Sequence, residues 1–165
     1  MAPFKIATSR EINKILLKIE GSIDETAHFP PFNCKPADSI YVDLGGVVHI
    51  NSVGVKNWIL FLKKIPFVNV VHYQNIPRIM VDQINMISGF MNANSVITSF
   101  YVPYYCEKCS KSSQKLFVSG VDFDFETKRV DLDTKNTEYV CDQANCEIAM
   151  DVMPNKYFRF VKKEN

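Results

Sequence analysis

The pattern of apolar and polar positions changes its period near residue 50. Residues 40–44 form a short apolar run rich in β-branched side chains, which is typical of a buried strand in an α/β sheet. Gly45 and Gly46 follow and predict a glycine loop. From Val55 to Leu62, apolar residues recur at spacings of three and four, and this period predicts an amphipathic helix.

The same reading of the whole chain predicts an α/β (α+β) fold with one mixed sheet of about four to five strands backed by helices, plus a small β appendage. We divide the chain into a sheet domain, 1–102, and an extension, 103–165, packed on it. An aromatic-rich segment, 153–160, is expected to dock as a strand or short helix. The predicted strands cover 4–7, 14–20, 40–44, 68–73 and 96–102, and the predicted helices cover 53–64 and 78–86.

Composition narrows the classes of function. The 165 residues, 47% of them hydrophobic, suffice for one sizeable domain. The net charge is only +1 and the basic residues are dispersed, which argues against nucleic-acid binding. No apolar run approaches the roughly 20 residues of a membrane span, so we expect a soluble protein that does not bind membranes. The first residues lack a secretory signal pattern, which predicts a cytoplasmic location.

The start of the predicted helix at 53–64 is the first candidate site. The N-terminus of a helix leaves backbone N–H groups unpaired, and Asn51 or Ser52 is the natural residue to cap them. A hydroxyl at this position could also hold a phosphate once modified, because the helix N-terminus carries a partial positive charge. Ser52 is therefore either only a cap or a switch.

The wider pattern around Ser52 resembles the STAS domain, the family of bacterial anti-sigma factor antagonists and of the cytoplasmic tails of sulfate transporters. Residues 17–24 (LKIEGSID) are similar to the family's L-x-G-x-L-D strand end, and residues 40–44 (IYVDL) to its V-x-L-D-L strand. Residues 50–55 (INSVGV) are similar to its I-D-S-S-G signature. The order and spacing of these motifs cover about the first hundred residues.

The resemblance implies a regulatory role in partner switching. In such family members the serine at the position of Ser52 is phosphorylated by a cognate kinase, and only the unmodified form binds that kinase or an anti-sigma partner. The resemblance thus implies a partner surface around Ser52 that includes Asp24, Asn51, Val53 and Gly54. The family's usual acid before the serine is Asn51 here, and its following serine is Val53.

Cysteine spacing gives the second candidate site. Cys106 and Cys109 form a Cys-x-x-Cys pair, and Cys141 and Cys146 form a Cys-x4-Cys pair. Together they look like a zinc ribbon, with predicted strands at 115–121 and 129–132 forming a hairpin between the two pairs. The segment between the pairs is polar, and its scattered phenylalanines are expected to be too few for an independent core. A structural Zn²⁺ would therefore staple this part of the chain.

Two alternatives to zinc stay open. The cysteines could form disulfides or remain unpaired thiols, although a reducing cytoplasm favours metal over disulfide. Cys34 has no partner nearby in the sequence and is expected to be a spare, half-buried thiol. A C-terminal ribbon after a STAS-like core also resembles an uncharacterised bacterial group with this arrangement.

Enzymatic function finds no support in the motifs. The three histidines stand in unrelated contexts, and neither a G-x-G-x-x-G motif nor a P-loop is present. A set of four cysteines would fill the coordination of zinc and leave no open position. The sequence therefore predicts a bacterial regulatory protein–protein interaction module. The alternatives are a ribbon that binds nucleic acid or the transcription machinery, and a purely structural oligomerisation unit such as a homodimer.

Overall fold

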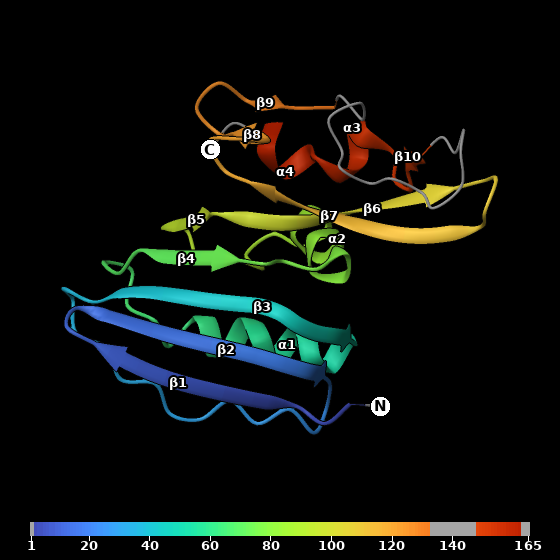
Figure 1. The fold of residues 1–165 in the computed structure, drawn as a ribbon. Helices are drawn as coiled ribbons and strands as arrows, with labels where there is room; N and C mark the ends of the chain where they lie inside the picture. The colour runs from blue at the N-terminus through green and yellow to red at the C-terminus, as the bar shows by residue number, and fades with distance from the viewer. Residues whose placement is uncertain (1, 133–147, 163–165) are drawn as a thin grey trace.

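The computed structural model describes residues 2–132 and 148–162, and these residues adopt an α+β fold, as predicted. Five strands form a mixed sheet in the order β1-β2-β3-β4-β5, in which β1 runs antiparallel to β2 and the other neighbours are parallel (Figure 1). These strands are β1 (Lys5–Glu11), β2 (Lys14–Ile23), β3 (Ser39–Ile50), β4 (Val71–Gln74) and β5 (Ser95–Ile97).

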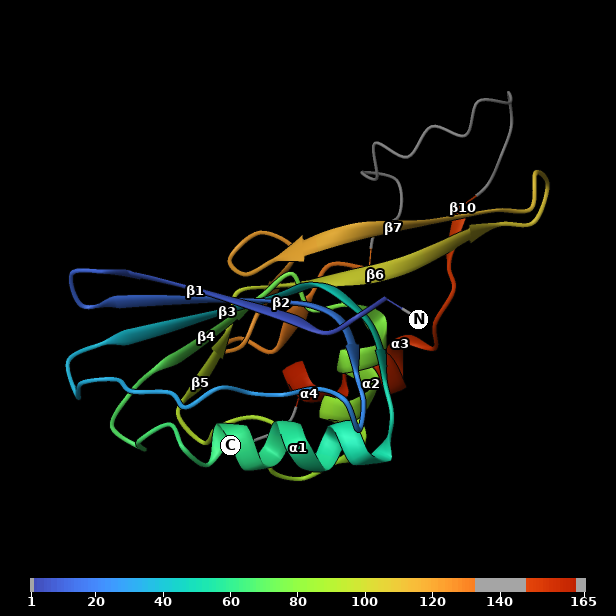
Figure 2. The same ribbon diagram turned by 90° about the horizontal axis from the view of Figure 1, so that it is seen from below.

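α1 and α2 lie on one face of this sheet, and Figure 2 shows its opposite face free of helices. In Figure 1, α3 and α4 lie beyond β5, beside strands that come later in the chain. Alternate strand residues such as Ile15, Leu17 and Ile19 are fully buried, which is the period-two pattern of a sheet with one covered face. The helices are α1 (Ser52–Leu62), α2 (Arg78–Met86), α3 (Pro154–Tyr157) and α4 (Arg159–Lys162).

A second, antiparallel sheet follows the first. It has the order β10-β6-β7, and a separate ribbon joins β8 to β9. The predicted hairpin between 115–121 and 129–132 is therefore wrong: β7 pairs with β6, and β9 pairs with β8. The strands are β6 (Ser99–Cys106), β7 (Lys111–Val118), β8 (Phe123–Asp124), β9 (Arg129–Val130) and β10 (Ile148–Met150).

An aromatic cluster joins the second sheet to the helices that follow it. Phe100 of β6 is fully buried, and its ring lies 5.7 Å from Phe117 of β7 and 5.0 Å from Phe160 of α4 between ring centroids. The buried side chains of both sheets form one hydrophobic cluster. The phenylalanines between the cysteine pairs were expected to be too few for an independent core. In the structure Phe117 and Phe123 join the common cluster, where Tyr157, Phe158 and Phe160 from the end of the chain pack with them.

Two further segments differ from the prediction. β3 continues through Gly45 and Gly46 to Ile50, so the predicted glycine loop is part of a strand. A Cβ added at Gly46 would lie 2.5 Å from Glu20 Cγ, so glycine lets β3 pass close to β2 here. The predicted strand at 96–102 is divided at Thr98 into β5 and β6, which belong to different sheets.

The remaining elements agree more closely with the sequence. α2 has the predicted bounds, and α1 begins one residue earlier and ends two residues earlier than predicted. The segment 153–160 forms α3 and the first part of α4, and β6 runs through the predicted boundary between 102 and 103. None of the helices in the described part of the chain is long and apolar enough to traverse a lipid bilayer.

Candidate functional site

The N-terminus of α1 is capped by Asn51. Its backbone is extended (φ −110°, ψ 178°), and its side-chain Oδ1 accepts a hydrogen bond of 2.8 Å from the Gly54 N–H. Of the two cap candidates in the sequence, the structure uses Asn51. The Ser52 side chain is exposed, and its hydroxyl makes no hydrogen bond to the residues that the structure describes. The hydroxyl is therefore accessible and not needed to start the helix.

Two carboxylates lie beside this cap. Glu25 Oε2 accepts a hydrogen bond of 2.8 Å from Asn51 Nδ2, and Asp24 Oδ1 accepts bonds from the Thr26 hydroxyl (2.6 Å) and the Thr26 N–H (2.9 Å). The bond from Asn51 lowers the pKa of Glu25, and the bonds from Thr26 lower the pKa of Asp24. Both side chains are thus negatively charged at neutral pH.

Gly54 brings α1 into direct contact with the end of β2. A Cβ at Gly54 would lie 1.8 Å from the Ile23 carbonyl oxygen, so only glycine fits at this distance. The Asn51 N–H also donates to the Ile23 carbonyl, at 3.2 Å. The loop after β2 therefore lies beside the start of α1, as the sequence predicted, and Gly54 itself is buried.

We call this region the α1 N-terminal surface and define it by the half-buried Asp24 and the exposed Glu25, His49, Ser52 and Val53. The His49 side chain lies near both carboxylates, and its electrostatic interaction with them further lowers the pKa of each. Val53 is 46% exposed and supplies an apolar contact beside the Ser52 hydroxyl. No hydrogen bond joins His49 to Ser52 within residues 2–132 and 148–162, so His49 is not positioned here as a base for the Ser52 hydroxyl.

The first cysteine pair occupies the tip of the β6–β7 hairpin. Cys106 is the last residue of β6 and is buried, and Cys109 lies half-buried in the turn that follows. The chain returns to this tip, because Ile148 of β10 pairs with Cys106. Cys141 and Cys146 lie outside the described residues. Among the residues described, no group of three or more His, Cys, Asp or Glu side chains could hold a metal ion.

Cys34 lies apart from the other cysteines in the fold. It belongs to the loop between β2 and β3, and its Sγ lies 3.6 Å from Asn69 Oδ1, to which it donates. Burial raises the pKa of this thiol, which keeps it protonated and unreactive at neutral pH. The Cys34 side chain therefore serves packing.

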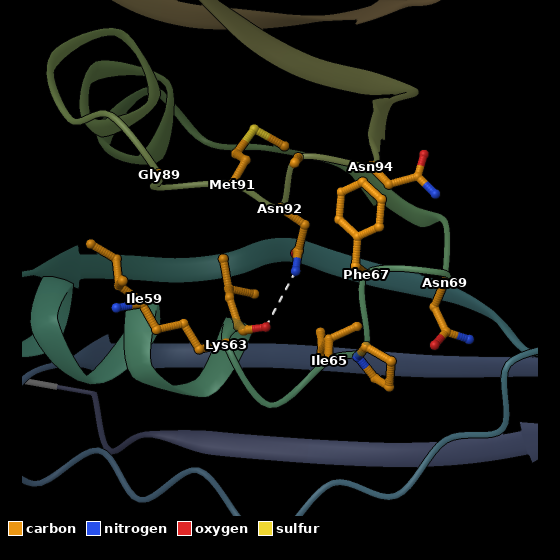
Figure 3. Close-up of a pocket in the computed structure, with 12 residues that line it drawn as sticks. Ile59, Lys63, Ile65, Phe67, Asn69, Gly89, Met91, Asn92 and Asn94 are labelled. Carbon is orange, nitrogen blue, oxygen red and sulfur yellow. Dashed lines mark hydrogen bonds between the residues drawn. The ribbon is translucent and has the colours of Figure 1, made fainter.

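A pocket of about 410 Å³ lies at the other end of α1 (Figure 3). Its wall includes Ile59, Ile65 and Phe67, and Asn92 Nδ2 donates a hydrogen bond of 3.3 Å to the Leu62 carbonyl at its edge. Lys63 is the ionisable side chain among the lining residues, which include no carboxylate, histidine or cysteine. The pocket therefore lacks an acid–base pair. The sequence analysis missed it, because two loops distant in the sequence form its walls.

Comparison with known proteins adds no identity: no family model matches the chain, and no curated protein matches its sequence. The resemblance to the STAS family consequently rests on the motifs of the chain and on the order of its elements.

Proposed function

We propose that this protein is a bacterial, cytoplasmic regulatory module of the STAS type that binds another protein through the α1 N-terminal surface. The partner would be an anti-sigma factor, a kinase or another signalling protein, and phosphorylation of Ser52 would regulate binding. The observation that carries this proposal is the exposed Ser52 hydroxyl, which stands at the first position of α1 while Asn51 performs the capping.

The charges around Ser52 explain how phosphorylation would act. A phosphoserine carries about −1.5 to −2 charges at pH 7. At Ser52 that charge would stand beside Asp24 and Glu25, which are already negative, and beside the exposed apolar Val53. A partner that packs against this surface would have to desolvate all of these charges. Phosphorylation is therefore expected to release the partner.

Substitution of Ser52 tests this mechanism. We expect Ser52→Ala to keep partner binding and Ser52→Glu to weaken it at least about tenfold, through charge repulsion and desolvation. The measurement is affinity capture from native cells with wild type and both variants, followed by titration of the purified partner. Ser88→Glu, at an exposed serine beyond α2, controls for the added charge.

Two results separate the parts of this proposal. A partner captured equally by wild type, Ser52→Ala and Ser52→Glu would remove Ser52 from the mechanism and keep the protein a constitutive binding module. Phosphopeptide mapping of protein from native cells provides the second result. Phosphate on Ser52 would support switching, and an unmodified Ser52 under all growth conditions would contradict it.

The proposal includes a structural Zn²⁺ held by Cys106, Cys109, Cys141 and Cys146. The tip of the β6–β7 hairpin presents Cys106 and Cys109 three positions apart, as zinc knuckles require. Cys146 stands two positions before Ile148, whose backbone pairs with Cys106. A short chain connection thus links the second cysteine pair to the strand that reaches the first.

Metal analysis tests the zinc proposal. We expect about one Zn²⁺ per chain, and loss of that ion in Cys109→Ser, because three thiolates bind zinc less tightly than four. Cys34→Ser is the matched control and should keep its zinc. Thiol titration in chelator and denaturant should find all 5 cysteines. Zinc-free protein with fewer reactive thiols would instead establish disulfides.

A further inference from the structure

β1 is an open edge of the five-stranded sheet. It is the outermost strand and pairs with β2 from Lys5 to Glu11 without a register shift. Figure 1 shows β1 as the outermost strand of this sheet, with the loop between β2 and β3 running beside it. Six of its seven residues are exposed, the exception being the half-buried Ile6. A regular edge strand of this kind can accept another strand.

The direction of the backbone groups of β1 follows from their neighbours. The Ser22 N–H of β2 donates to the Ala2 carbonyl on the β1 side, so even-numbered residues of β2 point their backbone groups toward β1. Their partners are the odd-numbered residues of β1. The N–H and C=O groups of Ile6, Thr8 and Arg10 therefore point away from the sheet, and none has a backbone partner in the part of the chain that the structure describes.

Some of the features that protect edge strands are absent from β1, and others are present: three of its residues are charged, and a loop lies against it. The strand contains no proline and no bulge, and its centre consists of the small residues Ala7, Thr8 and Ser9. The Arg10 guanidinium bonds to the Asn33 carbonyl and, at 3.1 Å, to Asp38, which fixes the loop of residues 24–38 to the strand.

The charges of β1 complement those of a second β1. In an antiparallel pair centred on Thr8, Lys5 of each copy faces Glu11 of the other, and Ala7 faces Ser9. Within the chain, Lys5 lies opposite Glu20 of β2, whose pKa it helps to lower, and Glu11 lies opposite Lys14, with 3.9 Å between Glu11 Oε2 and Lys14 Nζ. Both side chains are exposed at the edge of the sheet, so each can also face a charge of a second copy. A two-fold axis at Thr8 pairs opposite charges at both ends.

We propose that β1 pairs antiparallel with β1 of a second copy of this chain about a two-fold axis at Thr8. The two five-stranded sheets then join into one continuous sheet of ten strands. The outward N–H and C=O groups of Ile6, Thr8 and Arg10 exchange hydrogen bonds with Arg10, Thr8 and Ile6 of the second copy.

Substitution of the central residue is the first test. Thr8→Pro removes an outward N–H that the fold of one chain does not use, and edge strands tolerate proline in this position. We expect sedimentation to show a species of twice 18.9 kDa for wild type, and the dissociation constant to rise about tenfold or more in Thr8→Pro. Circular dichroism checks that the variant is folded.

Charge reversal is the second test and does not depend on Thr8→Pro folding well. Lys5→Glu alone places Glu against Glu, and Glu11→Lys alone places Lys against Lys, so each variant is expected to be largely monomeric. A mixture of the two restores both opposite-charge pairs and should form a heterodimer, detected by native mass spectrometry. Lys64→Glu and Glu126→Lys, at exposed sites in turns away from β1, are matched controls that should dimerise as wild type does.

Three outcomes would overturn the proposal. The first is a wild type that stays monomeric up to about 200 µM, well above the micromolar range of a specific dimer. The second is a dimer unaffected by Thr8→Pro and by both charge variants, which would place the interface elsewhere. The third is a mixture of folded Lys5→Glu and Glu11→Lys chains that fails to associate, which would exclude the register centred on Thr8.

Discussion

Gly54→Ala is expected to lower the free energy of unfolding by about 3 kcal/mol, because the new methyl group overlaps the backbone of β2. A Cβ at this position would lie 1.8 Å from the Ile23 oxygen and 2.5 Å from the Ile23 carbonyl carbon. These are backbone atoms at the end of a sheet strand and cannot rotate away. The first turn of α1 would have to move outward, which would break the 3.2 Å bond from the Asn51 N–H to Ile23.

Urea denaturation of Gly54→Ala, followed by circular dichroism, measures this loss. Val53→Ala is the matched control in the same turn, and its exposed side chain predicts a change within about 0.5 kcal/mol. A Gly54→Ala variant as stable as wild type would show that α1 can shift on the sheet. The family resemblance implied that Gly54 belongs to a partner surface. In the structure Gly54 is buried, and its lack of a side chain lets α1 pack directly against Ile23.

Phe100→Ala is expected to cost about 4 kcal/mol of stability, in the range for a fully buried phenylalanine. Its ring contacts aromatic rings from β7, β8, α3 and α4, so its loss opens a cavity where four elements meet. The partners and centroid distances are Phe117 (5.7 Å), Phe123 (4.8 Å), Tyr157 (6.4 Å), Phe158 (6.0 Å) and Phe160 (5.0 Å).

The fluorescence of Trp58, the sole tryptophan, shows whether loss of the Phe100 ring also destabilises the region of the five-stranded sheet. Trp58 is fully buried under the five-stranded sheet, and its Nε1 donates to the Phe90 carbonyl at 2.9 Å. If both sheets share one cooperative core, the Trp58 transition should shift together with the circular dichroism. Phe67→Ala, at a side chain 77% exposed, is the control with little expected effect. A Trp58 transition that does not move would show two independently folding units.

Local sequence signals predicted the elements near the candidate site. Asn51 was one of two cap candidates because it precedes a segment with helical period, and the structure shows its side chain in that role. The β2 end lies beside α1, as the motif order implied. The hydrogen bond of Glu25 to Asn51 could not be predicted, because nothing in the sequence shows that these side chains, 26 positions apart, meet.

Strand pairing was beyond the reach of local patterns. β7 and β9 both have the sequence pattern of strands, but that pattern does not indicate that β7 pairs with β6 and β9 with β8. The predicted loop at Gly45 and Gly46 was also wrong, because two consecutive glycines normally indicate a loop and here lie within β3. There β2 and β3 change register between Lys18 and Glu20, and the absence of side chains on β3 accommodates this close crossing.

The position of α3 and α4 late in the chain has a consequence for biosynthesis. A ribosome makes β6 and β7 well before α3 and α4, which supply Tyr157, Phe158 and Phe160. During translation the aromatic side of Phe100 and Phe117 therefore stays uncovered until these late residues emerge. A nascent chain at that stage exposes apolar surface of the kind that molecular chaperones bind. The rate at which the ribosome translates the last third of the coding sequence should consequently influence the yield of folded protein.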